Sequence, residues 1–114
     1  MPTTLPNGVV IDDLKVGAGK VCPKGAVVTV HYKGMLTSGT VFDQSKDEDG
    51  EGDPIEFPLG DLIEGWQHGI PGMKVGGKRR LNIPWKLAYG ERGSPPAIPP
   101  KADLVFEIEL LDVM

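Results

Sequence analysis

The sequence predicts an α+β protein in which an antiparallel sheet of about five strands curls around one short amphipathic α-helix. In the segments richest in apolar residues, these residues recur at every second position, which is the period of a half-buried strand. Only one segment has helical spacing, and the strand segments follow one another too closely for the long crossovers that join parallel strands. The 114 residues fit one domain, 1–114, whose residues 1–8 are expected to form a flexible lead-in.

Strands are expected at residues 9–14, 26–36, 41–43, 55–59, 78–84 and 102–113. The last of them alternates most clearly, because Leu104, Phe106, Ile108 and Leu110 face one side while Glu107 and Glu109 face the other. A turn at residues 37–40 is expected to join the second strand to the third as a hairpin.

The helix is expected between Asp61 and Gly69, with Asp61 available as its N-cap. The apolar face of this segment consists of Leu62, Ile63, Trp66 and Ile70. A helix of about two turns needs tertiary packing in order to form, so we expect it to lie against the sheet. A single helical turn at residues 85–89 and a loop at residues 90–100 are expected to precede the last strand.

Glycine and proline are unusually frequent, with 16 Gly and 11 Pro in the chain. This composition approaches that of low-complexity disorder, but 39% hydrophobic residues and a net charge of only −4 favour a folded core. The acidic balance argues against nucleic acid as a partner. Because the start MPTTLPNG lacks the features of a signal peptide and no long apolar stretch follows, we expect a soluble, cytoplasmic protein with no membrane contact.

The sequence offers little for covalent or metal chemistry. Cys22 has no partner at a metal-binding spacing and is interpreted as a thiol beside a turn. His31 and His68 lie outside any recognisable catalytic motif, and Ser94 is not in a nucleophile elbow. We therefore expect no catalytic triad, no metal site and no cofactor.

Residues 45–56 come close to the pattern of a calcium-binding loop. The carboxylates near its ligand positions are Asp47, Asp49, Asp53 and Glu56. Ser45 stands where such a loop begins with Asp, and neither flank is predicted to be helical. A solvated acidic loop is the favoured interpretation, and weak cation binding is the alternative.

Lys78, Arg79 and Arg80 form the one basic cluster of the sequence. Successive side chains of a strand point to opposite faces, so these three cannot form a single patch. We expect them on an exposed strand edge, with a minor role in steering acidic partners as the alternative.

The aromatic residues exceed what so small a core requires. They are Tyr32, Phe42, Phe57, Trp66, Trp85, Tyr89 and Phe106. Two interpretations stay open: the rings only pack against one another, or some of them line a ligand pocket. Asp43 beside Phe42 and the hydroxyl groups of Tyr32 and Tyr89 favour a pocket, since ligand pockets set a few polar groups in an apolar wall.

Four segments together resemble the FKBP family, the FK506-binding peptidyl-prolyl cis-trans isomerases. They are VHYKGMLTSGTVFDQS (30–45), GWQHGIPGMKVGGKRRLNIP (65–84), LAYGERG (87–93) and IPPKADLVFEIELLDV (98–113). The resemblance runs from about residue 9 to residue 113 in the family's order. It implies a five-stranded antiparallel sheet around a short helix, in agreement with the interpretation of the strand and helix patterns.

The resemblance also implies the site. The residues expected to act in catalysis are Tyr32, Phe42, Asp43, Ile63, Trp66, Tyr89 and Phe106, and those expected to contact substrate or inhibitor are Leu62, Ile55, Ala97 and Ile98. By the resemblance, Trp66 forms the floor beneath the proline ring. The backbone N–H of Ile63 and the hydroxyl of Tyr89 would donate to ligand carbonyls, and Asp43 would hold the tyrosine hydroxyl of the pocket.

The implied activity is rotation of X-Pro amide bonds by non-covalent binding, in assistance of protein folding. The implied ligands are proline-containing polypeptides and macrolide inhibitors of the tacrolimus and rapamycin type, and a monomer is expected. A non-catalytic module that binds proline peptides is the main alternative. A folding chaperone would normally need an inserted flap domain, for which the loop at residues 90–100 is too short.

Overall fold

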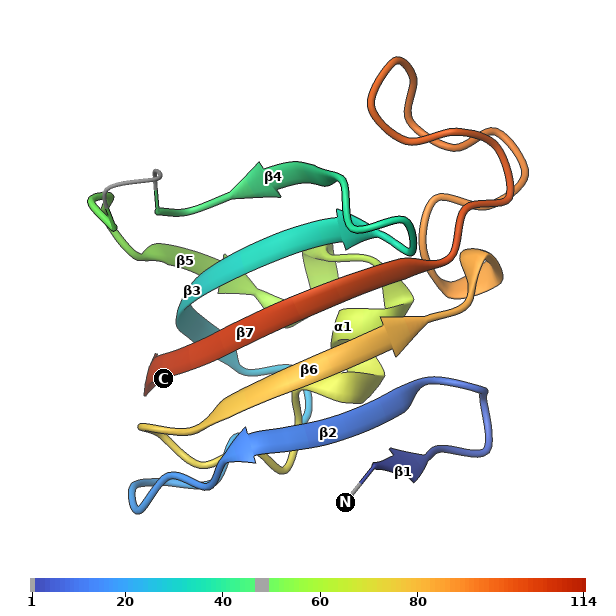
Figure 1. Cartoon of the computed structure of the whole chain (residues 1–114). Coiled ribbons are helices and arrows are strands. Elements are labelled where there is room, and N and C mark those ends of the chain that lie inside the picture. Colours follow the sequence, from blue (N-terminus) through green and yellow to red (C-terminus); the bar gives the residue numbers. More distant parts are fainter. Residues whose placement is uncertain (1, 47–49) are drawn as a thin grey trace.

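One antiparallel sheet dominates the computed structural model, which describes residues 2–46 and 50–114 (Figure 1). Its strands are β1 (Thr3–Thr4), β2 (Val10–Lys15), β3 (Val27–Leu36), β4 (Val41–Gln44), β5 (Ile55–Pro58), β6 (Lys78–Ile83) and β7 (Leu104–Val113). They lie in the order β1-β2-β6-β7-β3-β4, and β5 also pairs with β3. The predicted α+β class and antiparallel sheet are confirmed.

The predicted count of five strands is wrong, because the described residues form a sheet of seven strands. Two short strands, β4 and β5, share the same edge of β3 and pair with different parts of it. The two-residue β1 lies within the expected lead-in and pairs with β2 through Thr3 and Thr4. So short a strand has no periodicity by which a sequence could reveal it.

β3 and β7 form the centre of the sheet and pair from Val28 to Leu36 of β3. The alternation predicted for β7 is confirmed: Leu104, Phe106, Ile108 and Leu110 are buried, whereas Glu107 and Glu109 are only half-buried on the other face. Each buried side chain removes apolar surface from water, which is the main driving force of folding. The buried face therefore forms one side of the core.

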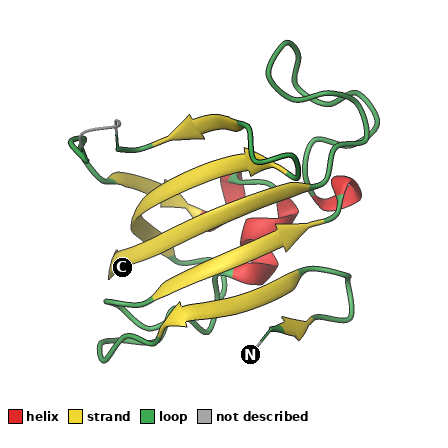
Figure 2. Ribbon diagram, in the orientation of Figure 1, coloured by secondary structure: helices red, strands yellow, loops and turns green. Residues whose placement is uncertain are grey.

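The helix α1 (Glu64–Gly69) packs on that same face of the sheet, and Figure 2 shows it behind the strands. The predicted N-cap, Asp61, is wrong: the structure places Ile63 at the N-cap, without a side-chain cap. Asp61 belongs instead to a 3-10 turn, η1 (Leu59–Asp61), that follows Pro58. Leu62, expected in the helix, is extended and separates the two helical segments.

The basic cluster does not lie on an exposed strand edge, so this expectation is also wrong. β6 lies between β2 and β7, and Arg79 is only 6% exposed. Its Nε atom lies 2.6 Å from Asp13 Oδ1, and its Nη1 donates to the carbonyl of Gly69 at the end of α1. Arg80, on the opposite face, forms an ion pair with Glu107 at 2.7 Å. The expectation that the cluster forms no single patch is confirmed.

A 3-10 turn, η2 (Trp85–Leu87), stands where a helical turn was expected, and the loop after it projects from one end of the sheet (Figure 1). Cys22 is buried in the core. Two carboxylates of the calcium-loop pattern, Asp47 and Asp49, lie outside the described residues. Within the described ranges, no group of side chains suited to a metal ion is found, and no helix is long and apolar enough to cross a membrane.

Candidate active site

A cavity of about 210 Å³ opens between the sheet and the start of α1. Its lining consists of Tyr32, Phe42, Asp43, Phe57, Leu62, Ile63, Trp66, Tyr89 and Phe106. Four strands, the segment before α1, the helix itself and the chain after η2 each supply at least one of these residues. The lining is mainly aromatic and aliphatic, and Asp43 and two tyrosines bring the polar side-chain groups.

Trp66 lies at the bottom of this cavity and is 4% exposed. Three rings meet its indole close to edge-on, with centroids 5.2 Å away for Phe106, 5.6 Å for Tyr32 and 5.8 Å for Phe57. Aromatic rings prefer this arrangement, because the positive edge of one ring meets the negative face of another. The indole N–H finds no hydrogen-bond acceptor within the described part of the chain. The floor is therefore a closely packed aromatic surface with one unpaired N–H group among the described residues.

Gly34 allows the rings of Phe42 and Phe106 to meet and form one wall of the cavity. It lies opposite Asp43 of β4 on one side and Phe106 of β7 on the other. A Cβ atom on Gly34 would come within 2.7 Å of the Phe42 ring and 2.8 Å of the Phe106 ring, which is closer than atoms pack. Without a side chain at this position, Phe42 and Phe106 meet edge to face at 5.7 Å.

The polar edge of the cavity is a hydrogen bond between side chains of neighbouring strands. The Tyr32 hydroxyl donates to Asp43 Oδ2 at 2.7 Å. Burial and this hydrogen bond raise the pKa of Tyr32 well above its usual range. Burial, and then the charge of Asp43, raise the pKa of Tyr89. Both hydroxyl groups are thus protonated at neutral pH, and Tyr89 can donate a hydrogen bond to a ligand.

A further donor lies at the junction of the segment before α1 and the helix. Ile63 is the N-cap of the helix, and its backbone N–H donates no hydrogen bond to another described residue. The first N–H groups of a helix have no partner within it. A ligand carbonyl in the cavity could accept from this group.

Most of the expected site residues come together here, but three do not line the cavity. Ile98 is 4% exposed and belongs to the core, Ala97 lies exposed on the projecting loop, and Ile55 pairs with Val30 at the start of β5. Their part in ligand binding stays a prediction. Conversely, Phe57 lines the cavity although it was grouped only with the general aromatic set. Gly34 was missed too, and a glycine inside a strongly alternating strand was the available signal.

Comparisons with known proteins show which family the chain belongs to. The family model of FKBP-type peptidyl-prolyl cis-trans isomerases matches residues 18–111. FK506-binding protein of Neisseria meningitidis serogroup B is 48% identical over 109 residues, covering 94% of this chain and 97% of that protein. FK506-binding protein 4 of Rhizopus delemar is 50% identical over 113 residues, which are 97% of this chain but 28% of the Rhizopus protein.

The solved structure of a peptidyl-prolyl cis-trans isomerase from Pseudomonas syringae pv. tomato superposes with a TM-score of 0.88. It is 38% identical in sequence, and the match covers 98% of this chain and 80% of that one. The protein is thus an α+β protein with an aromatic cavity of about 210 Å³ beneath its sheet. It belongs to the FKBP-type peptidyl-prolyl cis-trans isomerase family, as the resemblance predicted.

Proposed function

We propose that this chain accelerates cis-trans rotation of X-Pro amide bonds in polypeptides, with the cavity above Trp66 as the place where the proline binds. The observation that carries the proposal is the cavity itself: an apolar aromatic pocket with few polar groups, in a chain of this family. One domain spanning residues 1–114 is sufficient to form it. We further propose that the protein acts as a monomer in the cytoplasm.

This reaction suits a site without a nucleophile or a general base. Rotation of the amide breaks no bond and moves no proton, but it must overcome a barrier of about 18–20 kcal/mol from the loss of C–N resonance. The planar amide is more charge-separated than the twisted one. An apolar cavity that excludes water therefore disfavours the planar state relative to the twisted transition state, which is catalysis by differential binding.

The residue roles that we propose follow from where each group lies. Trp66 would support the pyrrolidine ring, and the rings of Phe42 and Phe106 would form the wall beside it. The Ile63 N–H and the Tyr89 hydroxyl would donate to carbonyls on either side of the rotating bond. The charge of Asp43 stays at the rim, where the Tyr32 hydroxyl satisfies it.

The same cavity is proposed to take macrolides of the tacrolimus and rapamycin type. Such ligands would offer an apolar ring to Trp66 and carbonyl oxygens to the two donors, in the way that a proline peptide does. Binding of this kind would compete directly with the peptide.

A protease-coupled isomerase assay on an X-Pro peptide tests the function. We expect the intact protein to accelerate isomerisation and Asp43→Leu to reduce kcat/KM, while Gln44→Leu leaves it within twofold. Gln44 is the matched control because it neighbours Asp43 on β4 but lies outside the cavity. Tight peptide binding without acceleration would instead identify a non-catalytic module, and equal effects of the two substitutions would mean that the cavity is not the site.

A further inference from the structure

The edge of β3 beside the cavity is covered by two strands that leave a gap between them. β5 pairs with Val27 to Val30, and β4 pairs with Lys33 to Met35. Neither strand pairs with His31 or Tyr32. A strand edge with unpaired N–H and C=O groups is costly when it is partly buried, so the backbone of Tyr32 needs partners from elsewhere.

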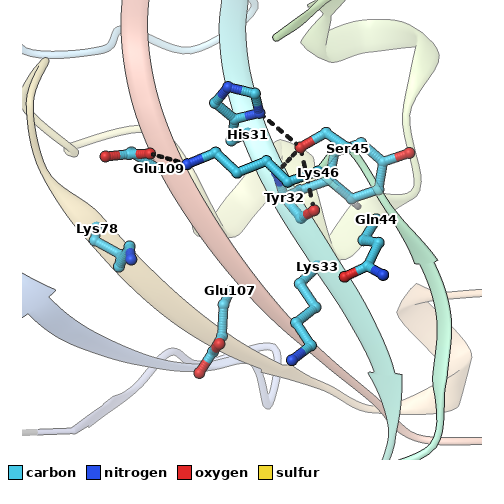
Figure 3. Close-up of a pocket in the computed structure, with 9 residues that line it drawn as sticks. All are labelled: His31, Tyr32, Lys33, Gln44, Ser45, Lys46, Lys78, Glu107 and Glu109. Carbon is cyan, nitrogen blue, oxygen red and sulfur yellow. Dashed lines mark hydrogen bonds and ion pairs between the residues drawn. The ribbon is translucent and has the colours of Figure 1, made fainter. Parts of the chain in front are cut away.

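Ser45 supplies these partners (Figure 3). Its backbone N–H donates to the Tyr32 carbonyl at 2.9 Å, and the Tyr32 N–H donates to Ser45 Oγ at 2.8 Å. The serine hydroxyl thus replaces the carbonyl that a continuous neighbouring strand would have offered. Gly52 packs directly against Ser45, since a Cβ atom on Gly52 would overlap the Ser45 carbonyl oxygen.

His31 offers this hydroxyl a further hydrogen-bond partner from the outer face of the sheet. Its Nδ1 lies 2.9 Å from Ser45 Oγ, whereas the Tyr32 carbonyl lies 3.3 Å away. A hydroxyl has one proton and two lone pairs. Ser45 can therefore donate to His31 Nδ1 while it accepts from the Tyr32 N–H, an arrangement that satisfies all three groups.

We propose that Ser45 is a positioning residue for the candidate active site, acting through Tyr32 and Asp43. Tyr32 is held twice by one short segment: its backbone by Ser45 and its hydroxyl by Asp43, two residues earlier. β4 is only four residues long and its register shifts beside Met35. Its pairing with Lys33 and Gly34 and the anchoring of Ser45 therefore together set the distance between Asp43 and the Tyr32 hydroxyl. This inference rests on the proposed isomerase function.

Ser45→Ala removes the acceptor of the Tyr32 N–H and leaves the end of β4 held to Tyr32 by one backbone hydrogen bond. We expect kcat/KM for an X-Pro peptide to fall about five- to tenfold, the size of one lost hydrogen bond. Ser45→Thr keeps the hydroxyl and should retain most of the activity. Ser45→Cys, whose sulfur is a weak acceptor of similar size, should lie between the two and serves if the alanine variant fails to fold. Ser38→Ala is the matched control, because Ser38 lies in the exposed turn at the other end of β4.

A double-mutant cycle separates positioning from general stability. If Ser45 acts through Tyr32, the loss caused by Ser45→Ala should largely disappear in a Tyr32→Phe background, since coupled residues are not additive. Losses that multiply in the double variant, or unchanged kcat/KM in a folded Ser45→Ala protein, would overturn the proposal.

An NMR readout keeps the proposal distinct from the isomerase function. The Tyr32 Cζ chemical shift, which reports the hydrogen bond of its hydroxyl to Asp43, should be the same in the intact protein and in Ser38→Ala, and should move in Ser45→Ala toward its value in Asp43→Leu. If the intact protein shows no isomerase activity, the proposed function fails, and this chemical shift alone still decides whether Ser45 positions Tyr32 against Asp43. An unchanged Tyr32 Cζ shift in folded Ser45→Ala would overturn the positioning role.

Discussion

Among the described residues that line the cavity, Asp43 alone carries a charge, and it acts on both tyrosines of the chain. It accepts the hydrogen bond of Tyr32 and raises the pKa of Tyr89 through its charge. Burial is the larger cause of the raised pKa for both hydroxyl groups. Because the chain contains two tyrosines and both lie in the cavity, tyrosinate absorbance reports on this site alone.

Replacing Asp43 with Asn should lower the pKa of both tyrosines, yet leave both above the ordinary value of about 10 because burial persists. A raised pKa in the folded state stabilises the protein below the ordinary pKa, and this stabilisation is lost as the pH rises above it. The intact protein should therefore lose stability above about pH 10, and the loss should continue to higher pH than in Asp43→Asn. Spectrophotometric titration measures the pKa values of the two tyrosines in the intact protein and in Asp43→Asn, with Asp112→Asn as the control. Tyrosines that titrate at the ordinary pKa in the intact protein would contradict the prediction.

At the scale of elements, α1 lies close to β6 because two helical glycines face that strand. A Cβ atom on Gly69 would come within 2.8 Å of the Leu81 side chain, and one on Gly65 would overlap Ile83. Trp66 follows Gly65 directly, so this close approach fixes how deep the floor of the cavity lies. Glycine is normally unfavourable inside a helix, and here the packing requires it.

Gly65→Ala should destabilise the protein by about 1–3 kcal/mol, since overpacking outweighs the better helix propensity of alanine. Gly60→Ala is the control, because nothing lies within 4 Å of the Cβ position at Gly60, and it should change stability by less than about 1 kcal/mol. Urea denaturation followed by circular dichroism measures both. Equal stabilities would mean that α1 does not rest on β6 through Gly65.

Arg79 joins three elements, because its guanidinium connects β6 to Asp13 of β2 and to the end of α1. Arg79→Met should lower the free energy of unfolding by about 2–4 kcal/mol. This loss is smaller than the loss expected on breaking a fully buried ion pair, because Asp13 keeps contact with water. Arg80→Met removes only the exposed pair with Glu107 and should cost less than about 1 kcal/mol. Chemical denaturation of the two variants distinguishes them, and similar losses would contradict the anchoring role of Arg79.

At the scale of the whole molecule, the sequence was most informative where the pattern is local. β3 and β7 are long and strongly alternating, so their faces could be predicted. The N-cap was misplaced because Pro58 and Leu59 start a 3-10 turn that helical spacing does not reveal. The burial of Arg79 could not be predicted, since it depends on β2 and β7 flanking β6, an order set by contacts distant in sequence.

In the candidate site, too, local motifs could be predicted and contacts between distant segments could not. Motif resemblance could place Tyr32, Asp43 and Trp66 in one site, and the structure brings them together. It could not show that Ile98 packs in the core, or assign Ser45, whose hydroxyl matters only because two strands share one edge of β3. Such a gap in a sheet edge is a property of strand register, which no single segment encodes.

The central claim is that the cavity above Trp66 is where X-Pro bonds rotate. The most direct measurement titrates tacrolimus into Trp85→Phe, in which Trp66 is the remaining tryptophan, while isomerase activity and fluorescence are recorded on the same samples. The account predicts that activity falls to the uncatalysed rate and that Trp66 fluorescence changes along one shared curve, complete at one ligand per chain. Activity that persists after the Trp66 signal saturates, or that is lost without any change in it, would contradict the account.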